Sequence, residues 1–200
     1  MTTIARLPVV VPADWVPGPL QGQWTYADYA ALPNDRQHYE VVKGVLYMAP
    51  APNMGHQGIS LEIAAYLRQF VQVAGLGRVF ATPTDVELSP GDVVQPDVFV
   101  VLNEHLDRIT YTRLIGAPNL AVEILSPGTM RHDLHEKLDA YARACVPEYW
   151  IVIPGEHVIE LLVLENRTYR SLGVFQGEAI LPSQIVPDWS VTVKQFFVFA

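Results

Sequence analysis

A glutamate stands inside one of the most apolar runs of this chain. Residues 120–125 read Leu-Ala-Val-Glu-Ile-Leu, so Glu123 has apolar neighbours on both sides. Burying an ionised carboxylate costs free energy unless the group is paired with a cation, hydrogen-bonded or bound to a metal. Asp97 poses the same problem, because it opens the apolar run 97–102 directly after Pro96. The chain must therefore fold so that both carboxylates find partners.

Short extended runs alternate with helical patterns along the chain. A hairpin is expected over 39–48, with its turn at Lys43-Gly44. The further expected strands are Arg78–Ala81, Asp85–Leu88, Asp97–Leu102, Leu120–Leu125, Glu148–Ile153, Val158–Leu164 and Tyr169–Val174. Helical spacing of apolar residues predicts helices over Thr25–Leu32, His56–Ala74 and Thr129–Ala144. This mixture predicts an α/β (α+β) fold in which helices flank a central mixed β-sheet.

The size of the chain fits one domain with its own core. Its 200 residues are 50% apolar and only 17% charged, which excludes extensive disorder. We expect a single domain over residues 23–200, with a capping segment from about residue 182. The proline-rich residues 1–22 are expected to form a loosely ordered N-terminal arm.

Several classes of protein are excluded or disfavoured by composition. The apolar runs are far too short to span a membrane, and the N-terminus lacks the apolar segment of a secretory signal. Cys145 is the single cysteine, so no internal disulfide can form. We therefore expect a cytoplasmic protein. The net charge of −8, with 13 scattered Lys and Arg residues, argues against strong nucleic-acid binding.

Lys137 is the candidate partner of the strand carboxylates. On the helix 129–144 it lies at the edge of the apolar stripe, which consists of Leu134, Leu138, Tyr141, Ala142 and Cys145. Its ammonium either reaches solvent or points across the sheet toward Glu123. Asp133 lies one helical turn earlier, where it is a partner of Lys137 or an outer group of the same site.

Two further polar residues are weaker candidates. Glu40 alternates with Val41 in the first hairpin, so its side chain faces either solvent or a site. His56 begins a helix, where polar residues are common without a function. Taken one by one, Glu123 is equally compatible with a structural salt bridge, and Asp97 with hydrogen bonds to loop amides.

Other chemistries find less support. His132 and His135 suggest a zinc hydrolase, but no third ligand stands at a recognisable spacing, and we expect both rings to be solvated or to contact phosphate. Ser126 lies between a strand and a helix, but the glycines of a nucleophile elbow are missing. Phosphate contacts are expected from Arg108 and Arg113 in the polar connection between two strands.

Several segments together resemble one bacterial family. They occur in the family's order and are Tyr39-Glu40-Val41-Val42-Lys43-Gly44, His56-Gln57, Gln95-Pro96-Asp97-Val98, Val122-Glu123-Ile124-Leu125-Ser126-Pro127 and Glu148-Tyr149-Trp150-Ile151-Val152. They resemble the Uma family of restriction-endonuclease-like proteins, within the PD-(D/E)XK nuclease superfamily. The resemblance extends over about residues 23 to 175.

The resemblance implies a restriction-endonuclease-like fold and a Mg²⁺-dependent (or Mn²⁺-dependent) site that hydrolyses phosphodiester bonds, with DNA as the expected substrate. Asp97 matches the first half of the superfamily signature and Glu123 the second half. Leu125 stands where the signature has its lysine, and the resemblance implies that Lys137 takes that role from the next helix.

The same resemblance implies a ligand set and supporting residues. The metal would be held by Asp97, Glu123 and the backbone carbonyl of Ile124, with Glu40 as a further ligand. His56 and Asp133 would support the site. Two alternatives stay open: a homodimer, and a catalytically weak or inactive protein that uses this fold as a binding or assembly module.

Overall fold

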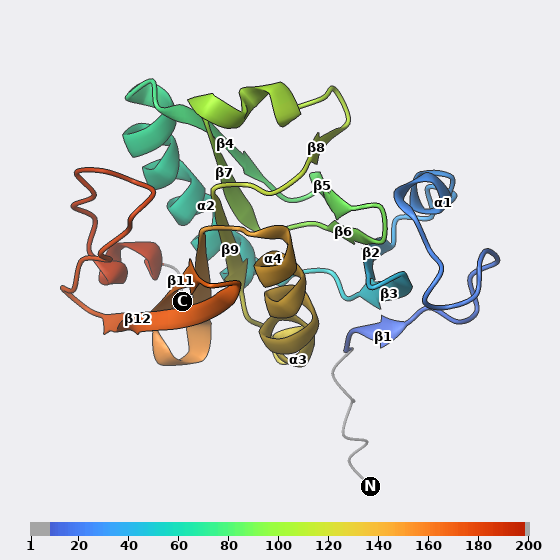
Figure 1. The fold of residues 1–200 in the computed structure, drawn as a ribbon. Coiled ribbons are helices and arrows are strands. Elements are labelled where there is room, and N and C mark those ends of the chain that lie inside the picture. The colour runs from blue at the N-terminus through green and yellow to red at the C-terminus, as the bar shows by residue number, and fades with distance from the viewer. Residues whose placement is uncertain (1–8, 199–200) are drawn as a thin grey trace, which may run out of the picture.

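Two mixed sheets make up the framework of the molecule. The computed structural model describes residues 9–198, and its strands form two six-stranded sheets (Figure 1). The first sheet has the order β1-β3-β2-β6-β5-β8, and the second has the order β12-β11-β10-β9-β7-β4. The expected α+β class is confirmed, but the strands divide between two sheets where the sequence predicted one central sheet.

The strands and helices have the following bounds. The first sheet contains β1 (Val11–Pro12), β2 (His38–Val42), β3 (Val45–Ala49), β5 (Asp85–Ser89), β6 (Asp92–Val94) and β8 (Arg113–Ile115). The second contains β4 (Gly77–Ala81), β7 (Val98–Leu102), β9 (Leu120–Ile124), β10 (Glu148–Ile153), β11 (Val158–Glu165) and β12 (Thr168–Gln176). The α-helices are α1 (Tyr26–Ala30), α2 (Met54–Leu67), α3 (Met130–His132) and α4 (Leu138–Ala144).

Short helical segments extend these elements. Two are π-helical: η1 (Arg68–Val73) continues α2, and η3 (Asp133–Lys137) joins α3 to α4. Three are 3₁₀-helical: η2 (Asn103–Arg108), η4 (Pro154–Glu156) and η5 (Val193–Phe196). Among the described residues, no helix combines the length and apolar character that a membrane crossing requires.

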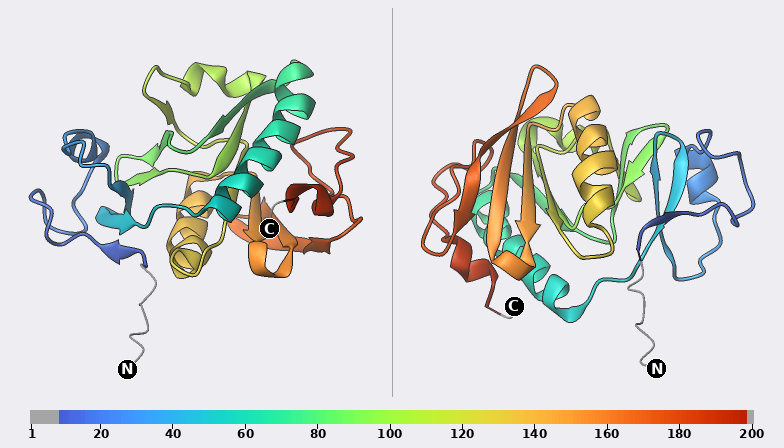
Figure 2. Two further views of the ribbon diagram at one scale, coloured as in Figure 1. Left: turned by 180° about the vertical axis from the view of Figure 1, so that it is seen from behind. Right: turned by 90° about the horizontal axis from the view of Figure 1, so that it is seen from below.

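The second sheet is covered by helices on both faces (Figure 2). Alternate residues of β9 point in opposite directions, so Leu120, Val122 and Ile124 pack in one core with α2. On the other face, Ala121 and Leu125 pack in a second core with α4. The alternation expected from the sequence is therefore present, and it directs Glu123 toward the helix that carries Lys137.

The hairpin of β2 and β3 turns at Lys43-Gly44, as the sequence predicted, and the hairpin of β11 and β12 has a turn of the same kind at Asn166-Arg167. Lys43 and Gly44 have φ angles of 53° and 70°, and Asn166 and Arg167 have 50° and 63°. These values lie in the left-handed region that two-residue hairpin turns need to match the twist of their strands. In the first hairpin, β2 and β3 pair with Glu40 opposite Tyr47, which fixes the register of Glu40.

Three strands were not predicted from the sequence: β1, which lies in the expected N-terminal arm, and β6 and β8. β6 and β8 are each three residues long, and β8 lies inside the segment read as a polar connection. Such short strands are defined by pairing across the sheet, β8 with β5 and β6 with β2, and local patterns carry little of that information.

The two ends of the described chain pack against the domain. Residues 1–8 of the expected arm lie outside the described residues, but Val11 pairs with Met48 and Ala13 is fully buried. Near the other end, Ser183 and the backbone of Gln184 hydrogen-bond to the carboxylate of Glu148.

Candidate functional site

Antiparallel pairing of β7 and β9 brings the two strand carboxylates together. Val98 pairs with Val122, so the next two positions, Asp97 and Glu123, lie across from each other at the same end of the two strands. Asp97 also accepts a hydrogen bond from the backbone N–H of Ile124, with a distance of 2.7 Å between that nitrogen and Oδ2. The two carboxylates are therefore fixed in place by backbone pairing.

Lys137 supplies the cation that these strands lack. Its Nζ lies 2.6 Å from Glu123 Oε1, 3.1 Å from Glu40 Oε1 and 3.5 Å from Asp133 Oδ1. The lysine side chain is only 4% exposed, so it does not reach solvent. It is the last residue of the π-helical segment η3, whose wider turn also presents Asp133 on the same side.

Glu40 connects the first sheet to the site. It comes from β2 and its side chain is buried, so it does not face solvent, which was one of the two expected alternatives. Its Oε1 accepts a hydrogen bond of 2.7 Å from the backbone N–H of Gln95. Its Oε2 lies 3.5 Å from Nε2 of His132. Neither Gln95 nor His132 was expected at the site in this role.

His56 is also part of the site. Asn53 caps α2 by accepting a hydrogen bond from the backbone N–H of His56, and this positions the imidazole. Nε2 of His56 lies 3.1 Å from Asp97 Oδ2. The other ring nitrogen, Nδ1, is buried and has no hydrogen-bond partner among the described residues.

Tyr141 donates a hydrogen bond in the site that the sequence analysis did not predict. The sequence placed Tyr141 in the apolar stripe of the helix, and its ring does pack in the core. Its hydroxyl, however, donates a hydrogen bond of 2.5 Å to Glu123 Oε1. Buried tyrosines usually pair their hydroxyl, which is the one signal that could have indicated this contact.

The site holds more negative than positive charge. Burial raises the pKa of Glu123 well above its usual value; Lys137 opposes the shift, whereas Asp133, Asp97 and Glu40 add to it. Burial also raises the pKa of Asp133. For Lys137, burial alone would lower the pKa, but the surrounding carboxylates outweigh it and raise the pKa well above its usual value. The lysine is therefore an ammonium.

Two other groups complete this charge pattern. Burial acts to raise the pKa of Glu40, but Lys137 and His132 outweigh it and hold the pKa at about 2. Burial acts to lower the pKa of His56, but Asp97 and Asp133 outweigh it and raise the pKa. Glu40 is thus the firmly ionised carboxylate of the site, and His56 holds its proton more firmly than a free imidazole does.

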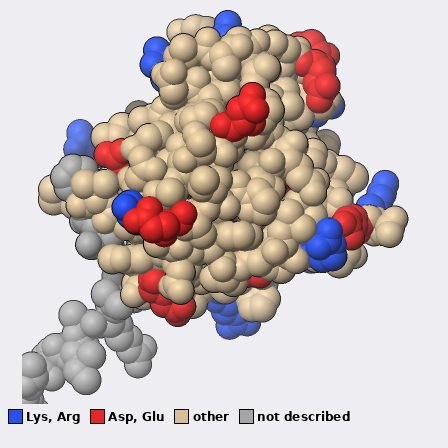
Figure 3. All heavy atoms as spheres, turned by 90° about the vertical axis from the view of Figure 1, so that its left-hand side faces the viewer, with Lys and Arg blue, Asp and Glu red and all other residues tan. Residues whose placement is uncertain are grey.

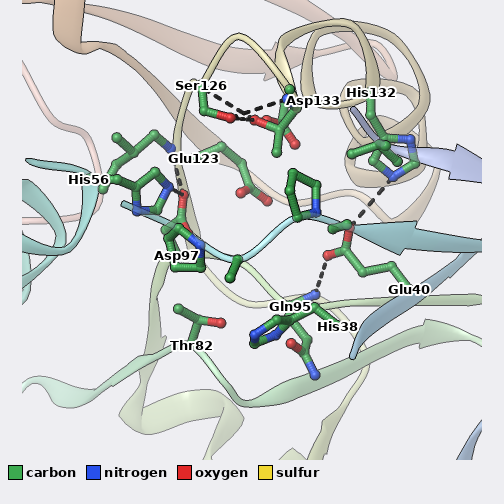
Figure 4. Close-up of a pocket in the computed structure, with 18 of the residues that line it drawn as sticks. His38, Glu40, His56, Thr82, Gln95, Asp97, Glu123, Ser126, His132 and Asp133 are labelled. Atoms are coloured by element: carbon green, nitrogen blue, oxygen red, sulfur yellow. Dashed lines mark hydrogen bonds and ion pairs between the residues drawn. The ribbon is translucent and has the colours of Figure 1, made fainter. Parts of the chain in front are cut away.

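All of these groups line one cavity of about 460 Å³ (Figure 4). The figure shows Asp97 with His56 on one side, Glu40 with Gln95 and His132 on another, and Glu123 and Asp133 between them. We call this cavity the acidic pocket. It is lined by all of the residues that the sequence analysis proposed as metal ligands, catalytic groups or supporting groups: Glu40, His56, Asp97, Glu123, Ile124, Asp133 and Lys137.

The donor chemistry of the acidic pocket fits a hard divalent cation. Carboxylate and carbonyl oxygens are the ligands that Mg²⁺ prefers. Burial raises the pKa of Glu123, and Asp133, Asp97 and Glu40 add to the rise; a bound cation would offset the negative charge of these neighbours. Within residues 9–198, no three acidic, histidine or cysteine side chains are already gathered into a metal-binding group. The ammonium of Lys137 lies among the carboxylates instead.

The alternative chemistries lose support. His132 is buried whereas His135 is exposed, so the pair does not face one site as zinc ligands would. Of the two expected alternatives for His132, solvation is ruled out and contact with phosphate stays a prediction. The hydroxyl of Ser126 contacts Thr129 at 3.2 Å and no histidine of the described chain. Arg113 donates to Glu87 at 2.6 Å and stacks on Tyr26, which engages it within the protein.

Comparison with known proteins identifies a family and a fold for the chain. A family model, Uma2, described as "Putative restriction endonuclease", matches residues 26–194. A crystal structure of a "putative nuclease" from Anabaena variabilis superposes with a TM-score of 0.73 at 19% sequence identity, covering 86% of this chain and 97% of that one. No curated protein matches the chain. The expected restriction-endonuclease-like fold is confirmed, and the roles of individual residues stay predictions.

Proposed function

Because the chain belongs to the Uma2 family of restriction-endonuclease-like proteins, we propose that it is a metal-dependent endonuclease that hydrolyses phosphodiester bonds in DNA. The observation that carries this proposal is the convergence of Asp97, Glu123 and Lys137 in the acidic pocket. An acidic pair that can hold a divalent cation, beside a buried ammonium, suits phosphodiester hydrolysis, because both cations can stabilise the charge that develops on the phosphate oxygens in the transition state.

Asp97 and Glu123 would hold Mg²⁺ or Mn²⁺, with the carbonyl of Ile124 and with Glu40 as further ligands. When bound, such an ion supplies charge neutralisation at the phosphate and lowers the pKa of a water molecule. The protein's own contribution is to hold these oxygens in place: backbone pairing fixes Asp97, and Tyr141 fixes Glu123.

Lys137 acts as a hydrogen-bond donor in this proposal. Its raised pKa means that it keeps its proton at neutral pH, so it orients the attacking water or stabilises charge on the phosphate. His56 and Asp133 position their neighbours, His56 through Asp97 and Asp133 through Lys137.

The distribution of charge restricts where DNA approaches. On the face shown in Figure 3, Lys and Arg side chains lie singly among Asp and Glu, and wide areas carry neither. Such a face offers no continuous row of phosphate contacts. We propose that DNA meets the protein at the mouth of the acidic pocket, where the bound cation compensates for the low content of basic residues.

The experiment that tests this function is cleavage of supercoiled plasmid and single-stranded DNA with Mg²⁺ or Mn²⁺. We compare the wild type with Asp97→Asn and Lys137→Met, and with Asp107→Asn as matched control. Asp107 is an exposed aspartate on η2, outside the acidic pocket. All proteins are purified identically and checked for folding by circular dichroism.

We expect the wild type and the control to cut DNA, and both pocket variants to lose cleavage by on the order of a hundredfold or more. Equal cutting by all four folded proteins would assign the activity to a contaminant and overturn the site. An absence of cutting in every preparation, together with DNA binding, would support the alternative of a binding or assembly module.

A further inference from the structure

A second cavity adjoins the acidic pocket. It has a volume of about 490 Å³, and residues of β4, β5, β7 and β8 line it, so it lies between the two sheets. Pro83 and Gln95 line both cavities, so the two are neighbours. None of the metal-site candidates lines this second cavity. A cavity of this size takes a small organic ligand.

Gln95 belongs to both sites through different atoms. Its backbone N–H donates to Glu40 in the acidic pocket, as described above. Its side-chain Nε2 donates to Asp85 Oδ1 at 2.8 Å and lies 3.1 Å from the hydroxyl of Tyr29. Because an aspartate can only accept here, the amide nitrogen must face Asp85, and the amide oxygen therefore points away from it.

Two hydrogen-bond acceptor atoms in the second cavity have no donor among the described residues. Tyr29 and Gln95 both donate to the same oxygen of Asp85, at 2.8 Å each. The other oxygen, Oδ2, has no hydrogen bond with any described residue, and neither has Oε1 of Gln95. A ligand that matches this edge must supply hydrogen-bond donors, such as an amino group.

Aromatic rings supply the apolar part of the cavity. Phe80 stacks on Phe99 with ring centroids 5.2 Å apart, and both line it. Tyr111 also lines the cavity and is fully exposed to solvent. An exposed tyrosine beside stacked phenylalanines is a surface on which a planar ring can stack.

We propose that this second cavity, which we call the base cavity, binds a nucleobase that carries an exocyclic amino group. The amino group would donate to Asp85 Oδ2 and Gln95 Oε1, and the ring would stack on Tyr111. This inference rests on the proposed function, because a nucleotide links its phosphate to its base through one sugar. Two neighbouring cavities can therefore hold the two ends of one nucleotide, with the base turned out of the stack.

The test uses nucleosides, which carry no phosphate and so do not depend on the acidic pocket. Isotope-labelled full-length protein is titrated with deoxyadenosine, deoxycytidine, deoxyguanosine and thymidine, and the shifts of the Gln95 side-chain amide and the Tyr111 amide are followed by two-dimensional NMR. Thymidine is the discriminating probe, because thymine has no amino group.

Two variants test the recognition groups. We expect Tyr111→Ala to weaken binding of the amino-bearing nucleosides at least about fivefold, whereas Tyr111→Phe keeps the ring and the affinity. Asp85→Asn keeps the oxygen that faces Tyr29 and Gln95 but turns an acceptor into a donor. It should therefore reverse the preference toward thymidine.

The outcomes separate this inference from the proposed function. Preferential binding of the amino-bearing nucleosides, lost in Tyr111→Ala and reversed in Asp85→Asn, supports the base cavity whether or not the preparation cuts DNA. Shifts of equal size for all four nucleosides, shifts that Tyr111→Ala and Asp85→Asn leave unchanged, or no shifts at Gln95 and Tyr111 would each overturn it. Loss of cleavage in Asp97→Asn with nucleoside binding retained assigns the two functions to separate cavities.

Discussion

Nζ of Lys137 and Oε1 of Glu123 lie 2.6 Å apart, and both side chains are almost completely buried. The same oxygen of Glu123 accepts the hydroxyl of Tyr141, and the same ammonium contacts Glu40 and Asp133. A buried ion pair of this kind is not a simple source of stability, because both ions have lost their water. Removing the ammonium of Lys137 would leave the surrounding carboxylates without a cation.

Lys137→Met is therefore expected to destabilise the protein. Without the ammonium, buried carboxylates face one another, and breaking one side of a buried ion pair costs about 3 kcal/mol or more. Urea unfolding monitored by circular dichroism measures the difference. The double variant Lys137→Met, Glu40→Gln should recover part of the loss, since it removes an ionised carboxylate that has lost its cation. An unchanged midpoint in Lys137→Met would mean that the pair carries no such coupling.

Glu40 predicts a specific pH dependence of stability in metal-free buffer. Its folded-state pKa of about 2 lies below its ordinary value of 4.5. A carboxyl with a lowered pKa adds stability that is fully present above pH 4.5 and is lost as the pH falls toward 2. We expect Glu40→Gln to show a shallower loss over this window. Parallel stability curves for the two proteins would contradict the assignment.

The raised pKa values of Glu123 and Asp133 predict the opposite dependence of stability on pH. Both have a raised folded-state pKa, so their contribution is most favourable at low pH and is lost as the pH rises above their ordinary range. Glu123→Gln should therefore gain stability relative to the wild type as the pH is raised toward neutrality. Thermal unfolding at a series of pH values measures the comparison. The prediction fails if the difference does not depend on pH.

Divalent cations should stabilise the folded protein. A ligand that binds only the native state adds RT ln(1 + [L]/Kd), which is about 2.7 kcal/mol at a hundredfold excess over Kd. We expect Mg²⁺ and Mn²⁺ to raise the Tm of the wild type and of Asp107→Asn, and to leave that of Asp97→Asn nearly unchanged. Differential scanning calorimetry with and without EDTA tests this. A similar rise in Asp97→Asn would place the cation elsewhere.

Substitution of Glu148 is expected to lower stability without changing the acidic pocket. Its fully buried carboxylate accepts hydrogen bonds from Trp150, Ser183 and the backbone of Gln184, and thereby ties the C-terminal segment to β10. Glu148→Ala should lower the free energy of unfolding by about 3 kcal/mol, because it leaves several buried donors unpaired. Ser183→Ala removes one donor and should cost less. Since Glu148 does not line the acidic pocket, the folded fraction of either variant should keep the wild-type activity.

Local sequence patterns predicted which face of the sheet Glu123 occupies and which edge of its helix carries Lys137. Strand alternation places Glu123 on the side of the helix 129–144, and helical spacing places Lys137 at the edge that faces the sheet. The turn at Lys43-Gly44 likewise followed from residue type. These features depend on neighbours within a few positions along the chain, so local periodicity carries them.

The partners of these side chains depend on packing between segments that are distant in the sequence. Glu40 is buried because the first sheet packs against the helix that carries His132 and Lys137, and nothing near Glu40 in the sequence indicates that packing. The same holds for Gln95, which joins Glu40 to Asp85 across two cavities. Burial and charge at such sites arise from contacts between residues far apart in sequence, which period and propensity do not encode.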